Sequence, residues 1–220
     1  LNVTKNALGP LMDKESFGLI FGAGTITYGL SFLLNGPLVD KIGGKRGIII
    51  ATLGSSIANI AMGVVTYLLL NHRWPFDLTL SFATLYSLNM FFQSYGAVSI
   101  IKVKAYWFHV RERGIFGAIF GTLISFGVYF AFDWGQAIAE AASAKGDNLS
   151  TFQIYFRQIF GLEGKTTDAT WLVFFIPATI LLGWTLLDAW LIRDTPSQAN
   201  FEDFDTHDAS SGEMHIDYTM

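Results

Sequence analysis

The sequence predicts an all-α protein, a polytopic membrane helix bundle. Hydrophobic residues make up 51% of its 220 residues and charged residues only 15%, with a mean hydropathy of +0.40. Soluble domains usually carry about 25% charged residues. The charges are also bunched, which leaves long windows with few of them. A soluble core built from such windows would leave almost nothing to face water, so the lipid bilayer is the predicted partner.

Five windows are long enough to cross a bilayer as helices, which takes about 20 mainly apolar residues. They cover about residues 16–39, 47–70, 78–108, 114–136 and 170–192. The third is longer than a span requires, so we expect it to tilt or to project into the headgroup region. Small residues recur at helix-packing spacing, which predicts a compact bundle; they are Gly18 and Gly22, then Ala51, Gly54, Ser55 and Ala58, then Gly117 and Gly121.

Clustered basic residues predict the orientation of these spans. Lys41, Lys45 and Arg46 follow the first window, and Arg111 and Arg113 follow the third, so these ends are expected in the cytoplasm. Residues 137–169 then form an external loop, whose aromatic stretch 152–160 suits a short interfacial helix. The loop either covers the outer mouth of the bundle or is an inert insertion. Residues 194–220 form a flexible acidic cytoplasmic linker, since six of the 18 acidic residues lie between 202 and 220.

Several classes of function have no support in the composition. The chain has no cysteine, which excludes disulfides and thiol chemistry, and its four histidines have no metal-ligand spacing. No nucleophile set or paired carboxylates stand at an interface, and no nucleotide-binding loop follows a strand. We therefore predict neither an enzyme nor a cofactor, a metal site or a nucleic-acid partner.

The loop after the first window carries the most specific motif. It reads Gly36-Pro37-Leu38-Val39-Asp40-Lys41-Ile42-Gly43-Gly44-Lys45-Arg46. This resembles the G-x-L-x-D-[RK]-x-G-x-[RK]-[RK] loop of the major facilitator superfamily, at the place where that loop belongs. The resemblance implies a conformational latch, whose candidate residues are Gly36, Asp40, Lys41, Gly43, Lys45 and Arg46, with Arg111 and Arg113 on the same side of the membrane.

Shorter strings resemble the organophosphate:phosphate antiporter branch of that superfamily, the glycerol-phosphate and hexose-phosphate carriers. They are Tyr28-Gly29-Leu30-Ser31, Phe92-Gln93-Ser94-Tyr95-Gly96, Glu112-Arg113-Gly114 and Arg193-Asp194-Thr195-Pro196. Aligned in this way, the chain holds spans two to six of a twelve-span fold, with residues 1–12 at the end of the first span and a six-helix half missing. Two cations that the branch places in spans two and five are replaced here by Phe32 and Ile124.

The resemblance implies a secondary active carrier that moves a small organic solute, an organic anion or a phosphate ester, by alternating access. It also implies a multi-pass protein of the bacterial inner membrane. The alternative function is a transporter-like membrane sensor that signals to a partner, which the loss of the two cations would suit.

Lys102 is the candidate substrate contact. It lies nine residues before Arg111, about 13 Å along a helix, and shares one helix face with Tyr95 and Ser99. A lysine at this depth costs about 2.5–3.5 kcal/mol on insertion scales, so it is a functional-site hypothesis by default. The alternative is a side chain that snorkels to the headgroups.

Overall fold

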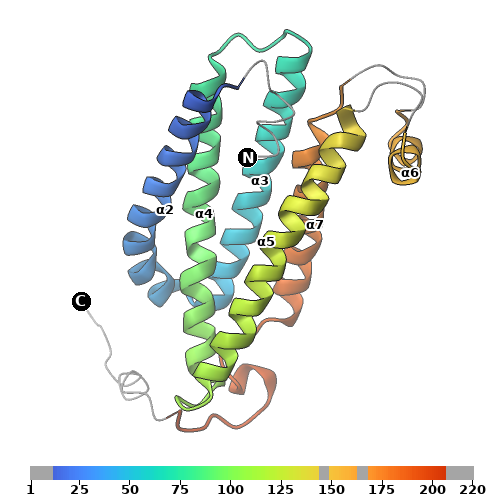
Figure 1. Cartoon of the computed structure of the whole chain (residues 1–220). Coiled ribbons are helices and arrows are strands. Elements are labelled where there is room, and N and C mark those ends of the chain that lie inside the picture. The colour runs from blue at the N-terminus through green and yellow to red at the C-terminus, as the bar shows by residue number, and fades with distance from the viewer. Residues whose placement is uncertain (1–11, 144–148, 163–167, 207–220) are drawn as a thin grey trace.

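The chain folds into long helices packed side by side, with one short helix set apart from them (Figure 1). The computed structural model describes residues 12–143, 149–162 and 168–206, and these contain no strand. The helices are α2 (Lys14–Ile42), α3 (Gly44–Leu70), α4 (Leu78–Trp107), α5 (Arg113–Ser143), α6 (Thr151–Ile159) and α7 (Leu172–Leu191), followed by the 3-10 turn Ser197–Ala199.

The predicted fold class, an all-α membrane bundle, is confirmed. By length and composition, α2, α3, α5 and α7 can each cross a membrane. The helix α4 has 30 residues but does not reach the same apolarity. Polar residues such as Asn89, Ser94 and Ser99 lower the apolarity of α4. All three are buried within the bundle. A helix in the centre of a bundle can carry polar groups that a lipid-facing helix cannot.

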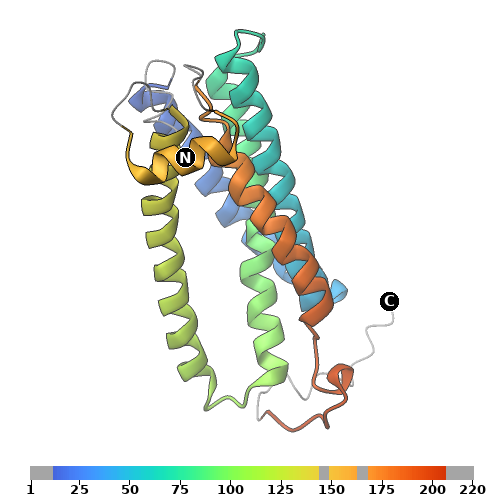
Figure 2. The same cartoon turned by 90° about the vertical axis from the view of Figure 1, so that its right-hand side faces the viewer.

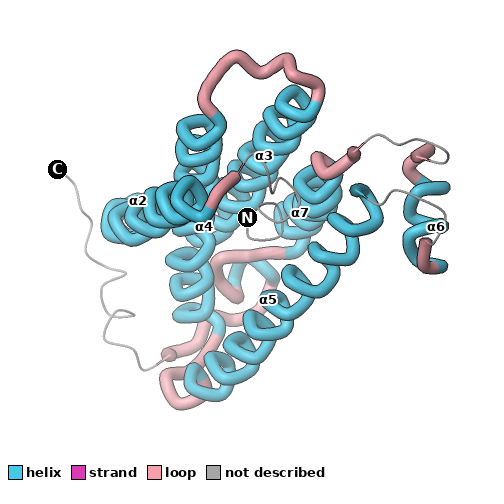
Figure 3. The backbone as a smooth tube through the Cα atoms, turned by 45° about the horizontal axis from the view of Figure 1, so that its top comes forward, coloured by secondary structure: helices cyan, strands magenta, loops and turns pink. Residues whose placement is uncertain are grey.

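The core of the bundle is α4 held between α2 and α3, with α7 on the other side of α3 (Figure 3). Ile20 of α2 and Phe82 of α4 are fully buried in one cluster with Met62 of α3 and Phe174 of α7. Where α3 crosses α4, a Cβ atom added at Gly54 would overlap the ring of Phe92. The absence of a side chain at Gly54 therefore sets how closely the two helices approach.

Hydrogen bonds between small polar side chains and the backbone also join the helices. The Asn35 amide of α2 donates to the Ser94 hydroxyl of α4. The Ser56 hydroxyl of α3 donates to the Ala178 carbonyl of α7 at 2.8 Å. Without a hydrophobic drive between helices in lipid, such contacts and close packing hold a membrane bundle together.

The small-residue prediction holds for α3 only. Ala51, Gly54, Ser55 and Ala58 are all buried. In contrast, a Cβ atom added at Gly18, Gly22, Gly117 or Gly121 would meet nothing within 4 Å, so these glycines do not bring described helices together. The stretch of α5 that carries the last two has exposed side chains on all its faces.

Two segments differ from their expected bounds. The helix α5 continues beyond residue 136 to Ser143, so its last two turns belong to the segment predicted as external loop. At the other end of the bundle, residues 194–206 fold back onto the helix ends: the Val110 amide donates to the Thr206 carbonyl at 3.1 Å, and the rings of Trp107 and Phe201 pack at 6.4 Å. The rest of the predicted linker, and all but Met12 of the predicted first-span end, lie outside the described residues.

Candidate functional site: the turn between α2 and α3

The turn between α2 and α3 is built from two glycines that tolerate no side chain. Gly43 adopts φ +92°, a conformation that L-residues with side chains rarely adopt. A Cβ atom at Gly44 would lie 2.5 Å from Val103 Cγ2 of α4 and 3.1 Å from the Ser99 carbonyl oxygen. The backbone of the motif loop is therefore pressed directly against α4.

Asp194, which follows α7, caps the start of α3. Its Oδ1 atom accepts a 2.6 Å hydrogen bond from the Lys45 amide, and its Oδ2 would lie 2.7 Å from a Cβ atom at Gly43. The first amides of a helix lack partners within the helix and carry partial positive charge, so a carboxylate is favoured there. This contact connects the end of α7 to the α2–α3 turn across 149 residues of sequence.

Lys102 of α4 contacts the end of α2, on the other side of the same turn. Its Nζ atom lies 2.8 Å from the Asp40 carbonyl oxygen, 3.3 Å from the Val39 carbonyl oxygen and 3.2 Å from Asp40 Oδ1. Backbone carbonyls in the last turn of a helix carry partial negative charge, so a cation is stabilised there, although the Val39 carbonyl also accepts from the Gly43 amide at 2.9 Å. The Lys102 side chain is 19% exposed and that of Asp40 is 73% exposed, so the carboxylate remains in contact with solvent.

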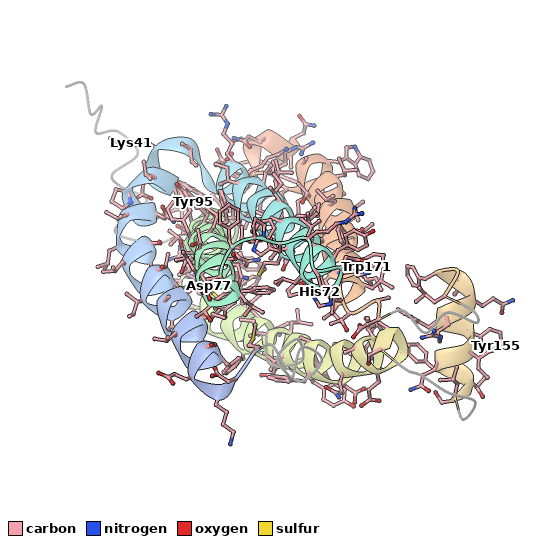
Figure 4. The ribbon with its side chains drawn as sticks, turned by 90° about the horizontal axis from the view of Figure 1, so that it is seen from above. Lys41, His72, Asp77, Tyr95, Tyr155 and Trp171 are labelled. Atoms are coloured by element: carbon pink, nitrogen blue, oxygen red, sulfur yellow. The ribbon has the colours of Figure 1, made fainter. Side chains whose placement is uncertain are left out.

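The remaining basic side chains of the turn point outward. Lys41 and Arg46 are exposed and Lys45 is half-buried. Together with Lys102 they line an open pocket of about 730 Å³, in which the only carboxylates among the described residues are those of Asp40 and Asp194. Figure 4 shows Lys41 at the edge of the bundle. The pocket is therefore basic, and it lies where the ends of α2, α3 and α4 meet.

Arg111 and Arg113 lie at the next turn, between α4 and α5. Arg113 donates through Nη2 to the Ala105 carbonyl at 2.8 Å and through Nε to the Phe108 carbonyl at 3.2 Å. It thus stabilises the end of α4 in the way that Lys102 stabilises the end of α2. Arg111 is exposed.

The structure brings Tyr95, Ser99 and Lys102 onto one face of α4, and that face is packed against other helices. Tyr95 is 8% exposed and packs with Val39 and Ala51, inside the bundle in Figure 4. Ser99 is fully buried where α3 crosses α4, beside Gly47. Neither residue lines the basic pocket beside Lys102, so their substrate role remains a prediction. Gly36 belongs to the expected latch, but a Cβ atom there would meet nothing within 4 Å, so no described contact requires a glycine at this position.

The larger hollow is a groove of about 960 Å³ between α3, α4, α5 and α7. Its walls are mainly apolar and aromatic, and none of the described residues that line it is charged. Its polar groups include the amides of Asn59, Asn89 and Gln93 and the hydroxyl of Tyr86. Gln93 donates to Asn89, which donates to the Ser55 carbonyl at 3.3 Å. No three His, Asp or Glu side chains within the described residues lie close enough to hold a metal ion.

Comparison of the sequence with models of known protein families identifies the family of this chain. Residues 3–207 match the family model described as Major Facilitator Superfamily. The chain belongs to this superfamily. The sequence prediction of the family is thereby confirmed, and with it an integral, multi-pass membrane protein of a transporter family.

Two curated proteins are similar to part of the chain. The membrane sensor protein UhpC of Salmonella typhimurium is 28% identical over 112 residues, and the protein of the same name from Escherichia coli is 29% identical over 112 residues. Each match covers 51% of this chain and 23% of the relative, so the matched part of the chain spans less than a quarter of these proteins. No solved structure matches.

The sequence motifs give no role to two polar residues of this superfamily member. Asp194 belongs to a short string in the sequence, and an acid just after a span, on the side of a basic loop, is a signal for a helix-capping contact. Asn35 belongs to no motif, but it is fully buried, and its amide donates to the Ser94 hydroxyl and, at 3.4 Å, to the Phe91 carbonyl. An asparagine within an apolar window is itself a signal for a helix contact.

Proposed function

We propose that the full-length protein is a secondary active carrier that moves a small organic solute across the membrane by alternating access. The single observation that supports this most strongly is the family match over residues 3–207. The geometry of the α2–α3 turn agrees with it, because Lys102 and Asp194 make ion and dipole contacts between separate helices that a change of conformation can break.

The expected first span has a place to pack in this arrangement. In the described bundle α4 lies between α2 and α3. The groove between α3, α4, α5 and α7 holds no described helix. The groove is lined by apolar and small residues such as Gly127, Ala131 and Ile180, which suit a helix more than a charged solute. We propose that the first span fills this groove, and that the solute binds between this half and a second six-helix half.

The finer proposal of an organic anion or phosphate ester rests on Lys102. In the described conformation its ammonium is occupied by the end of α2, so an anion would bind it only after that contact opens. The proposal is tested by solute uptake into proteoliposomes that contain the full-length protein. The solutes are a labelled phosphate ester, a labelled carboxylate and a labelled uncharged sugar of similar size. We expect uptake of a charged solute and not of the sugar. Uptake of the sugar alone would contradict the anion proposal.

A membrane sensor is the second candidate function, because both matched relatives carry that description. A carrier releases its solute on the far side, whereas a sensor only has to bind it. Tight solute binding to the purified full-length protein without accumulation in proteoliposomes would therefore favour the sensor.

We propose that the α2–α3 turn and residues after α7 face the cytoplasm and that α6 lies outside. The chain has no native cysteine, so single cysteines can be placed at two exposed residues, Glu202 and Gln158. In intact cells an impermeant thiol reagent should label Gln158→Cys, whereas Glu202→Cys should react only after the cells are opened. The reverse pattern would contradict the orientation derived from the clustered bases.

A further inference from the structure

The short helix α6 lies across the direction of the membrane spans. Figure 2 shows it running roughly perpendicular to α5 and α7, level with the first turns of α7, and Figure 1 shows that it projects sideways from the bundle. Spans are tilted by only about 20° on average from the bilayer normal. The axis of α6 is therefore nearly parallel to the membrane plane, at the depth where α7 enters the bilayer.

Specific contacts hold α6 in this position. Ser150 and Gln153 form a reciprocal capping box that fixes its start. Arg157, only 5% exposed, donates to the Ala141 carbonyl in the last turn of α5 at 3.2 Å and to the Leu162 carbonyl at 2.9 Å. Phe156 is buried in a cluster that includes Ala142 of α5 and Leu172 of α7. The helix is thus attached by one side to the ends of two spans.

The face of α6 next to this attached side is apolar and exposed. Phe152, Tyr155 and Ile159 follow one another at helical spacing and are 52%, 61% and 77% exposed. Figure 4 shows Tyr155 at the outer edge of the molecule, away from the bundle. In water, such a stripe on a short helix would be unfavourable, because three large side chains would keep most of their apolar area hydrated.

We propose that α6 is an interfacial helix whose Phe152, Tyr155 and Ile159 side chains insert into the bilayer at the boundary between headgroups and acyl chains. The stripe lies beside the ends of α5 and α7, at the level of the membrane surface, so the bilayer is the partner nearest to it. Aromatic rings with a polar edge are favoured at this boundary, and amphipathic helices lie in it parallel to the surface. Arg157 and Phe156 transmit this anchoring to the outer ends of α5 and α7.

Spin labels on the full-length protein in phospholipid vesicles test the proposal. One label replaces Ile159 on the stripe, and the matched control replaces Gln158, which is also exposed but lies about 100° around the helix from Ile159. Dissolved oxygen concentrates in lipid and a nickel chelate in water, so their collision rates with each label report its depth. We expect the Ile159→Cys label to collide several-fold more with oxygen, relative to nickel, than the Gln158→Cys label.

A second pair, Phe152→Cys and Thr151→Cys, should show the same contrast, since both residues are exposed and neither holds α6 in place. Equal access of nickel to stripe and control labels would overturn the proposal, because the stripe would then face water. Low access of both reagents to the stripe labels alone would also overturn it. That result would mean that protein, either a second copy or another part of the full-length chain, covers the stripe.

Discussion

Gly54→Leu is expected to prevent stable assembly of the bundle. A Cβ atom at this position would overlap the ring of Phe92, close to where the ring joins its stem, so a small rotation of the ring cannot relieve the clash. Overpacking a core typically costs about 1–3 kcal/mol, and here the added atoms must also separate α3 from α4. We expect a destabilisation at the upper end of that range or above it, seen as a lowered unfolding temperature and a reduced yield of monodisperse protein in detergent.

Gly18→Leu is the matched control for this prediction. Gly18 also lies within an apolar helix, but a Cβ atom there would meet nothing within 4 Å. The leucine is the same, so the difference between the two variants isolates the effect of the α3–α4 contact from that of adding a large side chain. Equal stability of the two variants would show that Gly54 does not set the distance between α3 and α4.

The spans could be predicted from the sequence because the length of an apolar window is a local property. The glycine turn was equally accessible, since Gly43 and Gly44 with flanking charges form a compact motif. The ends of helices at the membrane surface are harder to predict. The last turns of α5, up to Ser143, consist of alanines and polar residues that favour neither water nor lipid strongly.

Contacts between distant parts of the chain could not be predicted in the same way. The helix face shared by Tyr95, Ser99 and Lys102 follows from helical periodicity, but periodicity does not say whether that face lines a cavity or packs on a neighbour. Lys102 meets Asp40 across 62 residues, and Asp194 meets Lys45 across 149. Such pairs depend on which helices are adjacent, and that information is not contained in any single window.

The second large effect is expected at Lys102. This residue either holds the α2–α3 turn or also contacts the substrate, and the two roles can be tested separately. Lys102→Met removes the cation from the Val39 and Asp40 carbonyls as well as from the Asp40 carboxylate. The Val39 carbonyl keeps its hydrogen bond from the Gly43 amide, but both carbonyls lose a hydrogen bond from a charged donor, and such bonds contribute about 1.5–3 kcal/mol. Asp40→Asn removes only an exposed ion pair, and such pairs contribute about 0–1 kcal/mol. Thermal unfolding of the full-length protein should therefore rank Lys102→Met as clearly less stable than Asp40→Asn, with Lys102→Arg in between.

Solute measurements on the same variants decide whether Lys102 also touches the substrate. If Lys102 acts through the turn, Lys102→Met and Asp40→Asn both change the rate of transport, while the equilibrium Kd for the solute stays within about twofold of the unmodified protein. The reason is that both substitutions alter the balance between conformers without removing a group from the binding site. A substrate contact gives another pattern, because losing a hydrogen bond between charged groups weakens binding by about 1.5–3 kcal/mol, or roughly tenfold or more. Weakened binding in Lys102→Met but not in Asp40→Asn would therefore assign Lys102 to the substrate site, and the contact with α2 seen here would belong to the solute-free state alone.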